Sequence, residues 1–298
     1  MSTQREVVRM VASLTAACAL GAAVLGGVYI ATDRYQKAAS LRTERQAITQ
    51  LLSLDAGASI EEIEMSLDAE RSQVVYAAHG FGAGDQEGER LTFSLDGQLV
   101  AREGPGAHEA GGRASAGGAR KGMVPLGKVY VARVGGTLAG FVGESTTRGY
   151  KNKIRYLVAL TPAFEIAGVR VVEHEEDPGL GAEVATRAFQ GQFIARSSEA
   201  TASLDVTRDP MPEDWRSALA QLTRTPVDEW RAAHSDLIAR EGARPIYAVT
   251  GATISSRALT DGVRTTVERF RRRWELLESA RAGAPVSARA EPNHGGTP

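Results

Sequence analysis

The longest apolar run of the chain lies close to its N-terminus. Met10–Thr32 contains no charged residue over 23 positions, and about 20 apolar residues suffice to cross a bilayer as a helix. The polar, helix-forming stretch Tyr35–Leu54 predicts that this helix continues past the apolar run. We therefore predict an N-terminal transmembrane helix. A cleaved signal peptide is the alternative, because the run is rich in alanine and contains Ala-x-Ala-like sites.

The middle of the chain alternates short apolar segments with glycine-containing turns, a pattern that is typical of antiparallel strands. Two hairpins are predicted, at Leu91–Val100 and Val129–Val142, because Asp-Gly and Gly-Gly pairs suit tight turns. Ile154–Leu160 and Ile166–Val172 predict two further strands. By contrast, Ser59–Glu62 resembles a capping box, which predicts the start of a short helix.

The C-terminal third of the chain has helical spacing. Apolar positions recur every three or four residues from Leu259 to Leu277 and predict one long amphipathic helix. Trp215–Leu222 and Trp230–Ile238 predict two short helices, whose tryptophans we expect to pack and not to react. The predicted fold class is α+β, with an N-terminal transmembrane helix followed by a mainly antiparallel sheet domain with packed helices.

These patterns divide the chain into four predicted parts. Glu103–Gly122 is a low-complexity Gly/Ala/Arg segment and predicts a flexible loop, and the Pro/Gly/Ala-rich C-terminus predicts disorder. The parts are a transmembrane anchor (1–34), a helical and β-hairpin extension that includes this loop (35–122), a cofactor domain with a helical insertion at about 207–244 (123–281), and a tail (282–298).

Composition narrows the chemistry that the chain can support. A net charge of −1 gives no reason to expect nucleic acid as a partner. Cys18 is the only cysteine, so this chain alone forms no internal disulfide, no cysteine-based zinc site and no iron–sulfur cluster. The five histidines have no metal-ligand spacing, and we predict no metal site. Redox chemistry would therefore need an organic cofactor.

One hydroxyl-rich turn, Val249–Ser256, leads directly into the predicted long helix. The start of a helix offers free backbone N–H groups and the positive end of the helix dipole, so it suits a phosphate. The alternative is an ordinary serine or threonine N-cap, since both residues are favoured there. The pattern alone leaves both interpretations open.

The turn also resembles a known motif. Thr250–Ser256, Thr-Gly-Ala-Thr-Ile-Ser-Ser, is similar to the flavinylation motif Ser-Gly-Ala-Thr-x-Thr-Ser of the FMN-binding domain family. In that family FMN is joined through its phosphate to the second threonine, and Ser255 stands at that position here. A second segment, His174–Gly181, resembles the family's His-x-Glu-Thr-Pro-Gly-Leu-Gly, with Asp177 in place of threonine. The family's usual aspartate before the first motif is replaced by Tyr247.

The resemblance implies a set of cofactor-binding residues and no catalytic ones. Ser255 would carry covalent FMN, attached from FAD by an FMN transferase. No His or Asp lies close to Ser255 in the sequence, so we expect the transferase to activate the serine. The remaining residues expected to contact phosphate or flavin are Thr250, Gly251, Ala252, Thr253, Glu176, Asp177, Gly179, Leu180 and Gly181.

The family includes the G subunit of the Rnf electron-transport complex and the C subunit of the sodium-pumping NADH:quinone reductase. The resemblance implies a single-pass protein of the cytoplasmic (inner) membrane, with an extracytoplasmic flavin domain and other membrane subunits as partners. The basic residues that flank the apolar run do not by themselves predict that orientation. We predict an electron-relaying subunit of an Rnf-like complex. A quinone-reductase C-type subunit, a stand-alone tethered FMN domain or scaffold, and a reductase with its own small-molecule substrate are the alternatives.

Overall fold

The computed structural model describes residues 2–55, 57–81, 88–104 and 122–282. The chain divides into two compact units, Met1–Ala47 and Ile48–Pro298. Most of the predicted loop at 103–122, and the predicted tail at 282–298 apart from its first residue, lie outside the described residues.

The first unit consists of a single helix, α1, which runs from Ser2 to Leu51 and so extends a few residues into the second unit. The helix includes both the apolar run and most of the polar stretch behind it, as the sequence predicts. Among the residues that the structure describes, no helix is both long enough and apolar enough to cross a membrane.

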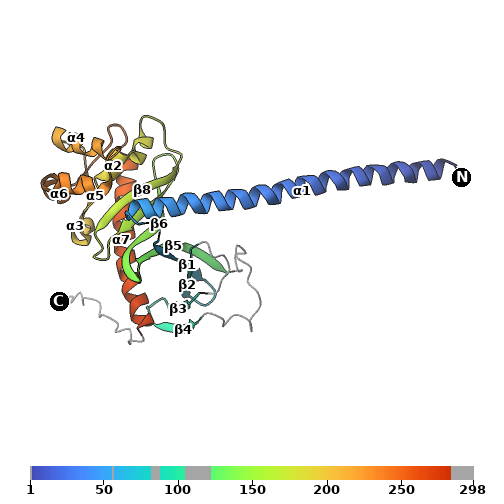
Figure 1. The fold of residues 1–298 in the computed structure, drawn as a ribbon, viewed down its shortest axis with the longest axis horizontal. Coiled ribbons are helices and arrows are strands. Elements are labelled where there is room, and N and C mark those ends of the chain that lie inside the picture. Colours follow the sequence, from blue (N-terminus) through green and yellow to red (C-terminus); the bar gives the residue numbers. More distant parts are fainter. Residues whose placement is uncertain (1, 56, 82–87, 105–121, 283–298) are drawn as a thin grey trace, which may run out of the picture. The chain divides into compact units, whose positions relative to one another are not determined.

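The second unit is built on an eight-stranded sheet in which every neighbouring pair is antiparallel (Figure 1). The strand order is β4-β3-β2-β1-β5-β6-β7-β8, so two four-stranded meanders meet through their first strands. The strands are β1 (Ser59–Asp68), β2 (Gln73–Gly80), β3 (Arg90–Ser94), β4 (Leu99–Glu103), β5 (Met123–Val134), β6 (Thr137–Arg148), β7 (Lys153–Leu160) and β8 (Ile166–His174).

Local turn chemistry explains the hairpins. Gly97 lies between β3 and β4 at φ +86°, and Gly135 and Gly136 join β5 to β6 at φ +57° and +83°. Glycine adopts positive φ without the steric cost that other residues incur, so these turns fix the strand pairing. The two hairpins and the strands β7 and β8 confirm the predictions made from the sequence.

The predicted short helix at Ser59–Glu62 is wrong, because these residues begin strand β1. Ile63 and Met65 are buried on alternate positions of β1, and the strand pairs with both β2 and β5. Two ladders of backbone hydrogen bonds and a buried face outweigh a local capping signal. Consequently β1–β4 extend the same sheet as β5–β8.

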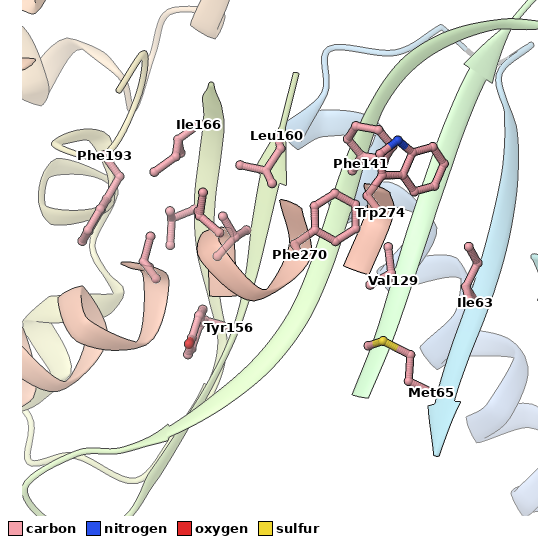
Figure 2. Packing of buried hydrophobic residues seen from close by; sticks show 14 of the residues in the cluster. Ile63, Met65, Val129, Phe141, Tyr156, Leu160, Ile166, Phe193, Phe270 and Trp274 are labelled. Atoms are coloured by element: carbon pink, nitrogen blue, oxygen red, sulfur yellow. The ribbon is translucent and has the colours of Figure 1, made fainter. Parts of the chain in front are cut away.

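The long helix α7, Thr253–Arg281, supplies the core on one face of the sheet. Its buried residues follow the predicted spacing, and Phe270 and Trp274 pack against Phe141 of β6 with ring centroids 4.9 and 4.6 Å apart. Figure 2 shows these three rings close together, and Ile63 and Met65 of β1 belong to the same cluster of buried residues. The helix therefore buries its apolar face against strands of both meanders.

Short helices complete the second unit beside β8 (Figure 1). They are η2 (Gly181–Ala185), α2 (Arg187–Gly191), α3 (Ser198–Ala202), α4 (Glu213–Gln221), α5 (Val227–Ala233) and α6 (Ser235–Gly242), with a two-stranded parallel pair, β9 (Val206–Thr207) and β10 (Ile246–Tyr247). The segment predicted as an insertion, at about 207–244, thus contains three helices where two were predicted, because the backbone leaves helical geometry at His234. Trp215 and Trp230 are buried in it, as expected of packing residues.

The observed class is α+β, with a mainly antiparallel sheet and packed helices, as predicted.

Candidate functional site

The helix α7 begins without a side-chain cap. Its N-cap residue is Ala252, preceded by a turn in which the Ala252 N–H donates to Val249 O and Gly251 has φ +78°. A serine or threonine N-cap, the alternative left open by the sequence, is therefore not what the structure contains. Because no cap side chain serves them, the first N–H groups of α7 keep their capacity to bind an anion.

The hydroxyls of the turn have different roles. Ser256 accepts the Val249 N–H at 3.0 Å and donates to Ala252 O at 2.9 Å, so it holds the turn together. Thr250 is exposed. Thr253 is half-buried and lines a groove with Arg208 and Arg257. The predicted residues of this motif therefore do not all face one point.

Ser255 faces the interior and is only 1% exposed. Its hydroxyl donates a hydrogen bond to Oε2 of Glu176, from the turn that follows β8. These residues are 79 positions apart in the sequence. The fold thus brings the two predicted motifs into direct contact, and Glu176 and Ser255 form the centre of the candidate site.

Glu176 is held from its other side by the loop between β6 and β7. It is 5% exposed and accepts backbone N–H groups from Tyr150 (3.3 Å), Lys151 (2.9 Å) and Asn152 (3.3 Å). Burial opposes ionisation of the Glu176 carboxyl, but the hydrogen bonds from Ser255 and these three amides outweigh it. The pKa of Glu176 is therefore below its ordinary value, and the group is a carboxylate at neutral pH.

Two glycines pack against this carboxylate. A Cβ on Gly181 would lie 2.5 Å from Glu176 Oε2, 2.9 Å from Glu176 Cβ and 3.0 Å from Ser255 Oγ. A Cβ on Gly149 would overlap Glu176 Oε1. Only glycine leaves room at both positions, so these residues shape the space around the Ser255 hydroxyl.

The remaining predicted residues form the rim of the site. Leu180 is 48% exposed, and its Cδ2 would lie 3.0 Å from a Cβ on Gly251, so the two motifs also touch at the surface. Gly179 is exposed and has φ +73°, as a tight Pro-Gly turn requires. Asp177 forms an ion pair with Lys151 at 2.7 Å, which partly compensates its negative charge.

The sequence did not single out the amides of 150–152 as part of the site. Backbone N–H groups carry no side-chain signature by which a sequence pattern could reveal them. Tyr247, where the family usually has aspartate, faces away from Ser255. Its hydroxyl donates to Glu241 at 2.9 Å, and its backbone exchanges hydrogen bonds with Gln192.

A second cluster of polar groups lies on the other half of the sheet. The ligand atoms of Glu62, Glu64 and His79 lie within 4.8 Å of one another, a spacing that a metal ion could use. However, the Lys128 ammonium lies 2.6 Å from Glu62 and 2.9 Å from Glu64. The Lys128 ammonium is therefore the cation that balances these two carboxylates in the structure.

The two motifs thus place a buried hydroxyl beside a carboxylate at the uncapped start of a helix. Residues 149–268 match the profile of the FMN-binding domain. This segment, which includes both motifs, belongs to the FMN-binding domain family.

Among curated proteins, the chain resembles G subunits of ion-translocating complexes. It is 30% identical over 139 residues to the G subunit of the proton-translocating ferredoxin:NAD(+) oxidoreductase complex of Clostridium ljungdahlii, covering 47% of this chain and 57% of that protein. It is 29% identical over 160 residues to the G subunit of the ion-translocating oxidoreductase complex of Stutzerimonas stutzeri, covering 53% and 56%. The chain thus spans little more than half the length of these relatives.

The crystal structure of Shewanella oneidensis NqrC aligns over 78% of this chain and 99% of that chain, with 16% identity and a TM-score of 0.42. A score this low does not establish a shared fold.

Proposed function

We propose that this chain is a membrane-anchored flavoprotein subunit of an Rnf-like electron-transport complex, with FMN joined to Ser255 through its phosphate. The observation that carries the proposal is the meeting of Ser255 and Glu176 at the uncapped start of α7, inside a segment that belongs to the FMN-binding family. The related G subunits support the assignment to an electron-transport complex.

The residues of the site fit an FMN phosphate. The first N–H groups of α7 and the positive end of its dipole would hold the phosphate oxygens, and Gly181 packs against the buried Ser255 hydroxyl through its backbone, where a larger residue would crowd the oxygen. The exposed Leu180 and the backbone of Thr250 and Gly251 offer a surface for the flavin ring. When bound, FMN accepts two electrons and releases them singly, which is the chemistry that an electron relay needs.

The membrane anchor and the orientation are part of the same proposal. The 23-residue uncharged run falls within α1, where the described large apolar side chains between Leu20 and Ile30 are exposed. Exposed apolar residues on a helix are stabilised by lipid. We place the flavin domain on the extracytoplasmic side, with membrane subunits of the complex as partners and an FMN transferase acting on the domain. Covalent attachment would keep the cofactor from being lost outside the cytoplasm.

The attachment is tested by co-expressing the full chain with an FMN transferase and examining denaturing gels under ultraviolet light. We expect a fluorescent band for the wild type and for Thr253→Ala, and a dark band for Ser255→Ala. Thr253→Ala is the matched control, because it removes a hydroxyl two residues away that lines a different groove. Fluorescence that persists in Ser255→Ala would assign the linkage to another hydroxyl.

The second candidate is a tethered binding module without covalent flavin. The substitution of serine for the family's threonine favours it, since the acceptor hydroxyl differs. A wild type that stays dark while free FMN still binds would support this second function.

A further inference from the structure

We infer that Glu176 is the residue that prepares the Ser255 hydroxyl for transfer of the FMN phosphoryl group, and that the acceptor chain therefore brings its own base to the reaction. This inference rests on the proposed attachment of FMN at Ser255. It replaces the expectation, drawn from the sequence near Ser255, that activation comes from the transferase alone.

The hydrogen bond to Glu176 fixes the orientation of the Ser255 hydroxyl. Ser255 Oγ donates to Glu176 Oε2, so its proton points at the carboxylate and its lone pairs point away from it. The carboxylate cannot turn freely, because three backbone N–H groups of residues 150–152 hold its oxygens. A nucleophile with a fixed proton acceptor on one side is ready to attack from the other.

The neighbouring hydroxyls lack this arrangement. Ser256 donates to Ala252 O, a neutral acceptor within the helix start, and also accepts the Val249 N–H. Among the described residues, no carboxylate is hydrogen-bonded to the hydroxyl of Thr250 or Thr253. Glu176 therefore distinguishes one hydroxyl among the four in the Thr250–Ser256 motif, which explains how a single serine can be selected.

The proposed step balances without a further reactant besides FAD. Ser255 Oγ forms a bond to the flavin-side phosphorus of FAD, and the bond between that phosphorus and the bridging pyrophosphate oxygen breaks. AMP leaves with the bonding electron pair. The Ser255 proton moves to Glu176 Oε2 and from there to solvent, and no atom is oxidised or reduced.

The hydrogen bonds around Glu176 limit how strong a base it can be. They hold the pKa of its carboxyl below the ordinary value, and proton-transfer catalysis weakens as a base moves away from the working pH. General-base contributions span about 10²–10⁴-fold, so we expect the lower end, about 10²-fold, from Glu176.

The test measures initial rates of FMN incorporation into the flavin-free full chain by a purified FMN transferase with FAD, using in-gel fluorescence and intact mass. The test variant is Glu176→Gln, which keeps the size of the side chain. Glu175→Gln is the matched control: it removes a neighbouring carboxylate that accepts from the Asn152 side chain, whereas the Ser255 hydroxyl donates to Glu176. We expect kcat for the acceptor to fall about 10²-fold in Glu176→Gln at unchanged KM, and to stay at the wild-type value in Glu175→Gln.

A merely structural role would give a different result. Disorder of the turn would raise KM, whereas loss of the proton acceptor lowers kcat at unchanged KM. If Glu176→Gln does not fold, Glu176→Asp is used. It stays ionised but is one methylene shorter, so its kcat should also fall.

The experiment can contradict the proposed role of Glu176 and the proposed attachment at Ser255 independently of each other. A wild-type kcat in Glu176→Gln or Glu176→Asp, with Ser255→Ala unlabelled, overturns the role of Glu176 and leaves the attachment site standing. Labelling of Ser255→Ala at the wild-type rate overturns the attachment site itself.

Discussion

Replacing Gly181 by alanine is the most direct test of the site geometry, because it adds one methyl group at its centre. Gly181 does not have a positive φ, so alanine can adopt its backbone conformation. The cost comes from space alone: the new Cβ would lie 2.5 Å from Glu176 Oε2, 2.9 Å from Glu176 Cβ and 3.0 Å from Ser255 Oγ.

The expected loss of stability depends on which atoms must move to make room for the added methyl group. The Glu176 carboxylate could swing away, but it would then give up the Ser255 hydroxyl and the amides of residues 150–152. The Glu176 Cβ can move only with its backbone. Overpacking of this kind costs about 1–3 kcal/mol, and for a domain of this size each kcal/mol lowers the melting temperature by about 2–4 °C. We expect Gly181→Ala to melt about 2–12 °C below the wild type.

The assay is thermal unfolding of the flavin-free full chain, followed by circular dichroism. Gly242→Ala serves as the control, because a Cβ there meets nothing within 4 Å and its φ is also not positive. It should melt at or slightly above the wild-type temperature. If Gly181→Ala melts with the wild type, the close packing of Glu176 and Gly181 is not a property of the protein in solution.

Two further predictions concern charge. Because the pKa of Glu176 is lowered on folding, its carboxylate stabilises the fold above the unfolded pKa of about 4.3, and this stabilisation is lost as the pH falls through the folded value. The unfolding free energy of wild type should therefore approach that of Glu176→Gln as the pH is lowered from about 5 to 3; a constant difference in urea titrations would contradict this. The Arg281 side chain is 22% exposed and forms ion pairs with Glu61 (2.8 Å) and Glu89 (2.9 Å). Arg281→Met should therefore lower the free energy of unfolding in urea by about 1–2 kcal/mol, a value between those typical of exposed and of buried ion pairs. Arg71→Met, whose side chain is 73% exposed, should cost less than half as much; equal losses would show that Arg281 does not tie α7 to the sheet.

Elements with a local cause were predictable from the sequence. Gly97 and the Gly135-Gly136 pair fix their hairpins within a few residues, and the apolar spacing from Leu259 to Leu277 specifies α7 without reference to the rest of the chain. The prediction of secondary structure was wrong where pairing with strands distant in the sequence determines the conformation. Ser59–Glu62 carries a helix-start signal, but pairing with β2 and β5 makes it a strand.

The candidate site shows the same division. Its residue types were visible as two separate motifs, yet no local pattern joins Glu176 to Ser255 across 79 positions. The amides of residues 150–152 were invisible, because any sequence supplies backbone N–H groups. Their role depends on the β6–β7 loop meeting the turn after β8, which only the sheet order provides.

The position of Ser255 is set by the core as much as by the site. Ser255 is in the first turn of α7, and Leu259, Val263 and Phe270 are buried along the same helix. Because these apolar side chains fix the rotation of α7 about its axis, Ser255 must face the interior and Thr253, two residues earlier, must face another way. A substitution that rotated the helix would therefore remove the Ser255 hydroxyl from Glu176 without touching either residue. The selection of one hydroxyl in a hydroxyl-rich turn thus depends on hydrophobic packing that extends to the far end of the sheet.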